Sequence, residues 1–234
     1  KREYGIDVNK GNPQVSYREG FKKTNIHTEI YKRVYGNRSK SIEIGFKISP
    51  LDKNKYGLKF ENKLINKSVG IEYINAIYKG FNIAMSNGVL VGYPILNANI
   101  ELISLFSDSF DSDLLSFEIA ARGALIEAIK KANPFLLEPI MKLEIHTPID
   151  YVSDIIADIT KKRGNFEGIV SKNDENILKA IVPLSEMFGY VTTLRTITSG
   201  RAISNLEFYY YEEIPRNIEI KILLDVKGVS IFEN

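Results

Sequence analysis

The chain of 234 residues has no cysteine and no tryptophan, and it has only two histidines. Without cysteine there are no disulfides, no thiol catalysis and no cysteine-ligated zinc, which fits a reducing compartment. His27 and His146 have no serine or cysteine partner in a catalytic arrangement, so we interpret both as surface or strand-end residues. No apolar run approaches the roughly 18 residues of a membrane span. The first residues lack the apolar segment of a secretory signal, so secretion is not predicted either.

Neither sign of charge is in strong excess, because 31 lysines and arginines face 29 aspartates and glutamates. The net charge of +2 means that any affinity for RNA must come from local patches. The hydrophobic fraction of 44% and the charged fraction of 26% are those of a globular protein that can bury a core. The length suffices for one large domain or two small ones.

The first half of the sequence alternates strand and helix patterns. Apolar residues at every second position predict a half-buried strand over 42–48, and 100–105 is also strand-like. Helical spacing predicts a helix over 72–86, which ends at Asn87–Gly88, and a second over 113–132. The second helix is thin around Ala120, Ala121, Gly123 and Ala124, which would let it lie close to a sheet.

The second half has the pattern β-α-β-β-α-β, the order of a ferredoxin-like unit. Strands are predicted at 139–146, 165–171, 176–183 and 201–211, and the turn 172–175 joins the middle two as a hairpin. Helices are predicted at 150–162 and 186–198, with Ser185 as the N-cap of the latter. The run 161–164, Lys-Lys-Arg-Gly, is a helix C-terminal signal.

The sequence contains none of the motifs that bind nucleotide phosphates. There is no G-x-x-x-x-G-K-[ST] run, and no G-x-G-x-x-G follows a strand, so this chain is not expected to hydrolyse GTP or bind a cofactor. The acidic segment 107–113 holds Asp108, Asp111 and Asp113, but it lacks the glycine and distal glutamate of a calcium loop. We therefore favour helix capping by Asp111 or Asp113 over a metal site.

A basic segment lies between residues 18 and 40, where aromatic residues alternate with lysines and arginines. Basic side chains neutralise phosphates and aromatic rings stack on bases, so RNA contact is one interpretation. A solvated loop whose aromatic residues pack inward is the other. The candidate RNA contacts are Lys22, Lys23, Lys32, Arg33, Arg38 and Lys40, and the aromatic residues are Tyr17, Phe21, Tyr31 and Tyr35.

Several uncommon segments occur at fixed spacing. They are GNPQVSYRE (11–19), EYINAIYKGF (72–81), GYP (92–94), LLEPIMKLEIHTP (136–148), TKKRGNFEG (160–168) and VPLSEMFGYVTTLRTITSGRA (182–202). Together they resemble the C-terminal domains IV and V of translation elongation factor G. The resemblance covers most of the chain.

The resemblance implies an α+β fold with two domains. Residues 1–135 would form a ribosomal-protein-like β-α-β domain with a left-handed crossover, an exception to the usual hand. Residues 136–214 would form a ferredoxin-like βαββαβ domain. The tail 215–234 would be helical and would pack back on the first domain.

The resemblance also implies a function. The chain would be the ribosome-binding part of a translocation GTPase that promotes tRNA–mRNA movement, with GTP and Mg bound elsewhere in the full-length protein. A ribosome-recycling or ribosome-protection paralogue is the alternative. An independent ferredoxin-like enzyme is a third, against which the lack of a convergent catalytic set argues. The expected partners are rRNA of both subunits, in the decoding region and the GTPase-associated region. A monomer without membrane contact is expected, in the cytoplasm or an organelle (mitochondrion or plastid).

The implied contact residues include two departures from the family pattern. YKRVYGNRSK (31–40) stands where relatives carry a glycine-rich tip loop, and Asp108 stands where the second tip loop, here with Ser109, carries a histidine. An aspartate cannot donate like imidazole and would repel a nearby phosphate. A further RNA contact is expected in the second domain at Lys161, Lys162 and Arg163.

Overall fold

The computed structural model describes residues 15–35, 38–52, 55–65, 69–108, 113–172 and 175–227. Its contacts divide the chain into two compact units. We call Tyr17–Leu137 together with 213–227 the first unit, and Glu138–Glu212 the second unit. Strand β6 (Pro134–Thr147) contributes its first four residues to the first unit and the remainder to the second. The domain boundaries that we expect after residues 135 and 214 stay predictions.

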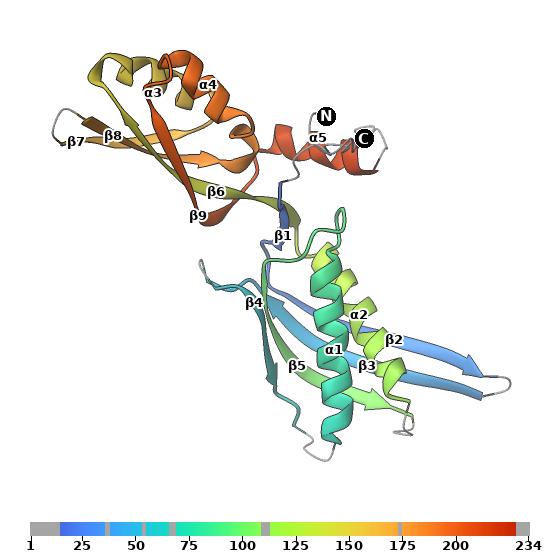
Figure 1. Cartoon of the computed structure of the whole chain (residues 1–234). Helices are drawn as coiled ribbons and strands as arrows, with labels where there is room; N and C mark the ends of the chain where they lie inside the picture. The colour runs from blue at the N-terminus through green and yellow to red at the C-terminus, as the bar shows by residue number, and fades with distance from the viewer. Residues whose placement is uncertain are drawn as a thin grey trace, which may run out of the picture. The chain divides into compact units, whose positions relative to one another are not determined.

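The first unit is built on a four-stranded sheet with the order β2-β3-β5-β4. Its strands are β2 (Asn25–Tyr35), β3 (Arg38–Ser49), β4 (Gly57–Asn62) and β5 (Asn97–Ser107). All neighbours are antiparallel except β4 and β5, which are parallel and are connected through helix α1 (Ile71–Asn87). The expected β-α-β crossover is therefore present, and its hand stays a prediction. Helices α1 and α2 (Leu114–Lys130) cover one face of the sheet, as Figure 1 shows.

The core of the first unit lies between this sheet and its two helices. Ile42, Ile44, Phe46 and Ile48 are all buried, as the period-two pattern predicts. The ring of Phe46 packs against that of Phe81 from α1, with centroids 5.1 Å apart. Aromatic pairs of this kind add to the stabilisation from burial alone.

The small residues of α2 serve mainly a helix–helix contact. A Cβ placed on Gly80 of α1 would collide with the carbonyl oxygen of Glu118 and would lie 3.0 Å from Cβ of Ala121. Ala120, Ala121 and Ala124 are buried in this contact and against the sheet, whereas a Cβ on Gly123 would meet nothing within 4 Å. The thin stretch of α2 thus accommodates α1 as well as the sheet.

His27 is a core residue, so our interpretation of it as a surface or strand-end residue was wrong. Its exposed fraction is 7%, its Nε2 lies 3.0 Å from Oε2 of Glu29, and its ring faces that of Phe46. The cause is the strand period, because alternate residues of β2 face α2 and His27 falls on that side.

A buried carboxylate organises the end of the first unit where α1 stops. Glu19, in strand β1 (Arg18–Phe21), is fully buried and accepts hydrogen bonds from five consecutive backbone N–H groups, those of residues 89–93, at 2.5 to 3.1 Å. The chain enters this loop through Gly88, whose φ is 62° and whose Cβ, if present, would collide with Glu19 and with the Tyr93 carbonyl. Only glycine suits that position.

Helix α5 (Arg216–Lys227) packs on the same end of the first unit. Leu223 and Ile214 form a small cluster with Leu136 of β6, and Tyr17, Leu90 and Tyr93 pack against it. Glu219 is buried and accepts a hydrogen bond from the backbone N–H of Leu136 at 3.0 Å. It also forms an ion pair with Arg216 at 2.6 Å. The cluster therefore needs Leu136 and α5 together.

The second unit has the ferredoxin-like arrangement that the sequence predicts. Its sheet has the order β9-β6-β8-β7, with β7 (Asn165–Lys172), β8 (Glu175–Pro183) and β9 (Ile203–Glu213). Helices α3 (Val152–Lys161) and α4 (Tyr190–Ile197) lie on one face (Figure 1). Their core contains Leu143, Ile145, Ile155, Ile159, Leu178, Val182 and Leu194.

The helix predicted at 186–198 begins later than expected, and Ser185 is not its N-cap. Residues Leu184–Glu186 form a short 3-10 turn, the chain turns again at Gly189 with a φ of 75°, and α4 starts at Tyr190. The Ser185 hydroxyl donates to Glu138 at 3.0 Å and accepts from Arg163 at 2.9 Å. Those charged partners bind Ser185 more strongly than backbone N–H groups would.

Gly80→Ala should destabilise the first unit, by about 1 to 3 kcal/mol or more, because the added methyl group meets backbone atoms of α2. Gly123→Ala is the matched control, and it should stabilise by about 0.5 to 1 kcal/mol because it only improves helix propensity. Urea denaturation measures both. Equal effects at the two glycines would contradict the close approach of α1 to α2.

Glu19→Gln should destabilise the first unit by about 2 kcal/mol or more. The amide presents N–H groups to a loop that already offers five donors, and the charge that strengthened those bonds is lost. Glu72→Gln, at an exposed position on α1, should stay within about 0.5 kcal/mol of the parent. Hydrogen exchange adds a local readout, because the amides of 89–93 should lose protection first.

Candidate RNA-contacting surfaces

The basic segment is not a loop but a β-hairpin with the short strand β1 before it. Lys22 and Lys23 lie between β1 and β2, Lys32 lies on β2, and Arg38 lies on β3. Strands β2 and β3 pair from Asn25↔Ile48 up to Tyr35↔Arg38. The sequence signal for a hairpin was the dipeptide Gly36–Asn37 between two segments that both form strands.

The strand register gathers positive charge at the closed end of this hairpin. It places Arg33 directly opposite Lys40, and Lys32 and Arg38 are their neighbours along the two strands. Like charges directly opposite each other destabilise a sheet. An anion bound at this end would remove that repulsion, so the register makes the hairpin end a candidate phosphate contact.

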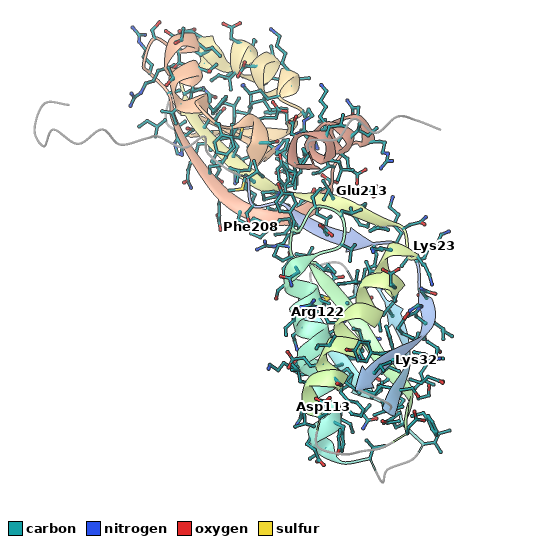
Figure 2. The ribbon with its side chains drawn as sticks, turned by 90° about the vertical axis from the view of Figure 1, so that its right-hand side faces the viewer. Lys23, Lys32, Asp113, Arg122, Phe208 and Glu213 are labelled. Carbon is teal, nitrogen blue, oxygen red and sulfur yellow. The ribbon has the colours of Figure 1, made fainter. Side chains whose placement is uncertain are left out.

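The three lysines of the segment whose side chains are described differ in their surroundings. Lys22 is engaged within the first unit, where its ammonium lies 2.6 Å from Glu213 and 5.2 Å from the centre of the Phe135 ring. Lys23 and Lys32, both labelled in Figure 2, are exposed. Lys32 and Lys23 are therefore better placed than Lys22 to meet RNA.

The described aromatic residues of the segment are part of the protein core. Phe21 is buried, Tyr31 packs against the main core of the first unit, and Tyr17 packs beside Tyr93 and Leu136. The side chain of Tyr35 is outside the described atoms. The inward-packing alternative thus holds for these three rings, and they are not available to stack on bases.

Asp108, at the end of β5, is bound to the start of β3. Its Oδ2 accepts hydrogen bonds from the backbone N–H and the hydroxyl of Ser41, at 3.0 and 2.7 Å, and its own N–H donates to the Ser41 carbonyl at 3.3 Å. Part of its negative charge is thus directed at protein donors. Ser109 and Asp111 lie outside the described residues. Asp113 occupies the N-cap position of α2, but its side chain makes no capping hydrogen bond to a backbone N–H there, and its carboxylate accepts from the Ser116 hydroxyl instead.

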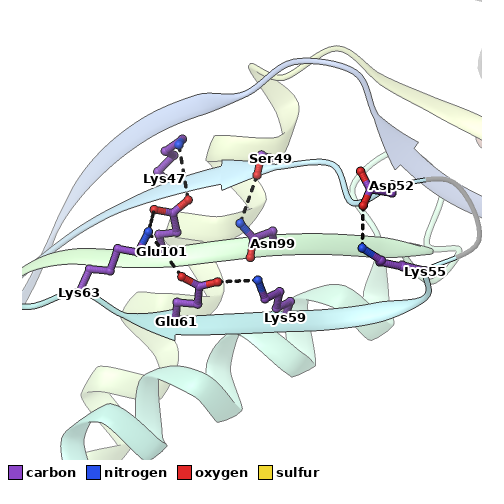
Figure 3. A network of polar contacts seen from close by, with 9 residues as sticks. All are labelled: Lys47, Ser49, Asp52, Lys55, Lys59, Glu61, Lys63, Asn99 and Glu101. Atoms are coloured by element: carbon purple, nitrogen blue, oxygen red, sulfur yellow. Dashed lines mark hydrogen bonds and ion pairs between the residues drawn. The ribbon is translucent and has the colours of Figure 1, made fainter.

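A ladder of ion pairs crosses the helix-free face of the first unit's sheet, and no pattern in the sequence predicts it (Figure 3). Glu101 on β5 pairs with Lys47 at 3.4 Å and with Lys63 at 2.5 Å, and Glu61 pairs with Lys59 at 2.6 Å. Hydrogen bonds from Lys63 and Lys59 lower the pKa of Glu101 and of Glu61, respectively. These lysines are neutralised locally, so the ladder is a weak candidate for RNA contact.

In the second unit, α3 ends in a Schellman motif with an unusual residue at its left-handed position. The N–H of Gly164 donates to the Ile159 carbonyl, and that of Arg163 donates to the Thr160 carbonyl. The residue with positive φ, 59°, is Arg163 rather than Gly164. Gly164 is required for space, since a Cβ there would lie 2.5 Å from Ile159 and 2.8 Å from Val182.

Arg163 holds this conformation because its guanidinium is bound by Glu138, Glu186 and Ser185. It pairs with both oxygens of Glu138 at 2.7 and 3.0 Å, donates to Glu186 at 3.0 Å, and donates to Ser185. Glu138 is 2% exposed. The hydrogen bond to Glu138 raises the pKa of Arg163, and Glu186 adds to it. These donors are used within the protein, whereas Lys161 is exposed and the ammonium of Lys162 lies 3.5 Å from the Glu186 carbonyl.

The described residues contain no group of three acidic or histidine side chains that could hold a metal ion. No helix among them is long and apolar enough to cross a membrane.

Two family models match the chain. The model described as "Elongation factor G, domain IV" matches residues 13–133, and "Elongation factor G C-terminus" matches residues 135–221. A crystal structure of a protein from Thermus thermophilus superposes with a TM-score of 0.83 at 28% identity, covering 93% of this chain and 32% of that one.

Curated relatives named elongation factor G cover nearly the whole chain. The protein of Cytophaga hutchinsonii is 43% identical over 231 residues, which are 99% of this chain and 33% of the relative. That of Karelsulcia muelleri is 49% identical over 216 residues, which are 92% of this chain and 31% of the relative. The chain thus spans about a third of the length of these relatives.

Arg163→Ala should destabilise the second unit by about 3 kcal/mol, because it leaves the buried Glu138 carboxylate unpaired. Arg163→Gly should be less harmful by about 1 kcal/mol, since glycine removes the same ion pair but relieves the positive φ. Arg195→Ala, at an exposed site on α4, is the control and should stay within about 0.5 kcal/mol. Chemical denaturation measures the series. An Arg163→Ala variant as stable as the parent would contradict a structural role.

Proposed function

This chain belongs to the elongation factor G family, and on that premise we propose that it is the ribosome-contacting part of a translocation GTPase. In the full-length protein it would promote tRNA–mRNA movement, with GTP and Mg bound by a part of the protein outside this chain. Residues 1–135 would act as domain IV, 136–214 as domain V, and 215–234 as a tail that returns to domain IV. The work of this part is steric and electrostatic, and no catalytic residue is assigned to it.

The observation that carries the proposal is the hairpin register, which gathers Lys32, Arg33, Arg38 and Lys40 at one end of the first unit. The charge distribution supports it. Residues 17–137 carry 17 lysines and arginines against 12 aspartates and glutamates, whereas residues 138–212 carry 8 against 11. The excess of positive charge therefore lies in the half that would enter the decoding region. Lys23 precedes the other end of β2 and is proposed as a separate contact, and Lys161 and Lys162 are the proposed contacts of the second unit.

The proposed partners are the rRNA of both subunits, near the decoding region and the GTPase-associated region, and the tRNA–mRNA complex. The protein would work as a monomer, in the cytoplasm or in an organelle. A recycling or protection paralogue is the second candidate. The observation that favours it is Asp108, because its carboxylate is held by Ser41 at a position where translocating relatives carry a histidine.

The test is the salt dependence of ribosome binding by chain 1–234. Removing three phosphate contacts with Lys32→Ala, Arg33→Ala and Arg38→Ala should make the slope of log K against log salt shallower by roughly 2 to 3 units. Filter binding to purified ribosomes between low and moderate salt measures the slope.

The matched control removes three exposed lysines from elsewhere on the first unit, through Lys55→Ala, Lys59→Ala and Lys79→Ala. Each of these pairs with an acidic residue, so the slope should change little. Equal losses in the two triple variants would mean that only overall charge matters and would remove the hairpin end from the proposal. A parent chain that does not bind ribosomes would overturn it altogether.

A further inference from the structure

One aromatic side chain of the second unit is presented to solvent on a tight turn between two anchors. Phe188 has an exposed fraction of 43%, whereas Met187 before it has 8% and Tyr190 after Gly189 has 3%. The N–H of Tyr190 donates to the Met187 carbonyl at 3.1 Å and closes the turn. Gly189, with φ 75° and ψ 1°, has the conformation of the third residue of a type II turn. Phe188 therefore occupies the turn's second position, at its apex.

The turn is supported by the ion-pair network of Arg163. Arg163 binds Glu186 and Ser185 in the 3-10 turn just before Met187, and the N–H of Met187 donates to the Leu184 carbonyl at 3.0 Å. Tyr190 on the other side is fixed in the core of the second unit. Both flanks of Phe188 are thus held by charge-assisted hydrogen bonds or by burial. A side chain on such a support contacts a partner with little loss of conformational entropy.

The surroundings of Phe188 combine apolar surface with positive charge. Val191, in the first turn of α4, is 55% exposed. Lys162 approaches Glu186, two residues before Phe188, and Lys161 is exposed at the end of α3. Glu186, two residues before Phe188, is paired with Arg163. Burial raises the pKa of the Tyr190 phenol, and Asp158 raises it further.

We propose that Phe188 is a base-stacking contact for folded RNA, with Lys161 and Lys162 as phosphate contacts beside it. Sequence-specific recognition of folded RNA uses the unstacked bases of loops and bulges, which pack on exposed aromatic rings while nearby cations meet the backbone. Residues 138–212 carry more acids than bases, so charge alone does not give this unit affinity for RNA. Base stacking would supply the remaining binding free energy. The inference rests on the proposed function and adds the chemistry of the second unit's contact.

The experiment compares variants of chain 1–234 for binding to purified large ribosomal subunits and to protein-free large-subunit rRNA. Phe188→Ala should weaken binding to both by roughly 5- to 100-fold, the range for loss of one stacked base. The slope of log K against log salt should stay that of the parent, because no charge is removed. Lys161→Ala with Lys162→Ala should instead make the slope shallower by roughly 1 to 2 units.

Three further variants separate stacking from other causes. Phe188→Trp keeps a π-face and should retain affinity, whereas Phe188→Leu keeps apolar bulk without a π-face and should lose it. Phe208→Ala is the matched control, since Phe208 on β9 (labelled in Figure 2) is exposed to 45% and its loss should not change binding. Melting temperatures of all variants should lie within about 2 °C of the parent, as expected for exposed positions.

The outcomes distinguish this inference from the proposed function. If Phe188→Ala binds both probes like the parent, the inference is overturned while the proposed function stands. If it loses affinity for subunits but not for free rRNA, Phe188 contacts a ribosomal protein and the RNA assignment is wrong. If Phe188→Leu binds both probes like the parent, apolar bulk suffices and the base-stacking assignment is wrong. A parent chain that binds neither probe overturns the proposed function, and the inference falls with it.

Discussion

The first unit depends on one buried negative charge. The carboxylate of Glu19 is surrounded by the five backbone N–H groups of residues 89–93. A buried ion without such donors would cost several kcal/mol, so the loop and the carboxylate require each other. The loop follows α1, and Glu19 lies on β1, which pairs with the start of β6. This interaction therefore fixes the end of α1, the strand β1 and the surface on which α5 packs.

The second unit also contains a buried glutamate, and an arginine side chain neutralises it instead of backbone N–H groups. Its buried glutamate, Glu138, is neutralised by Arg163, and the same guanidinium reaches Ser185 and Glu186. These residues lie in the segments LLEP, KKRG and PLSE, three of the segments that carry the family resemblance. Glu19 and the run GYP lie in two others, and they too are halves of one interaction. Several of the segments that carry the family resemblance thus serve to neutralise two buried glutamates. Their first role is structural.

Short-range patterns predicted most of the fold. The alternation over 42–48 and the β-α-β-β-α-β order of the second half are confirmed, because apolar period alone determines which face of an element is buried. Interactions between distant residues could not be predicted. Ser185 has the residue type of an N-cap, but Glu138, 47 residues away, and Arg163 bind its hydroxyl. Lys22, Asp108 and Arg163 were candidate RNA contacts from their residue type or from the family resemblance. Each has a partner in the protein that only the fold brings near. Phe188 was missed because exposure of a single aromatic residue leaves no sequence pattern.

The two units would bind RNA through different interactions. At the hairpin end of the first unit the strand register brings Arg33 opposite Lys40, and its binding energy would come from counterion release, which falls steeply with salt. In the second unit the acids outnumber the bases, so the proposed contact there combines stacking by Phe188 with two phosphate contacts, Lys161 and Lys162, and would depend less steeply on salt. A contact with a shallower salt dependence can persist while a charged hairpin exchanges one set of phosphates for another. On the proposed function, this difference would let the first unit change its phosphate contacts while the second unit keeps its own.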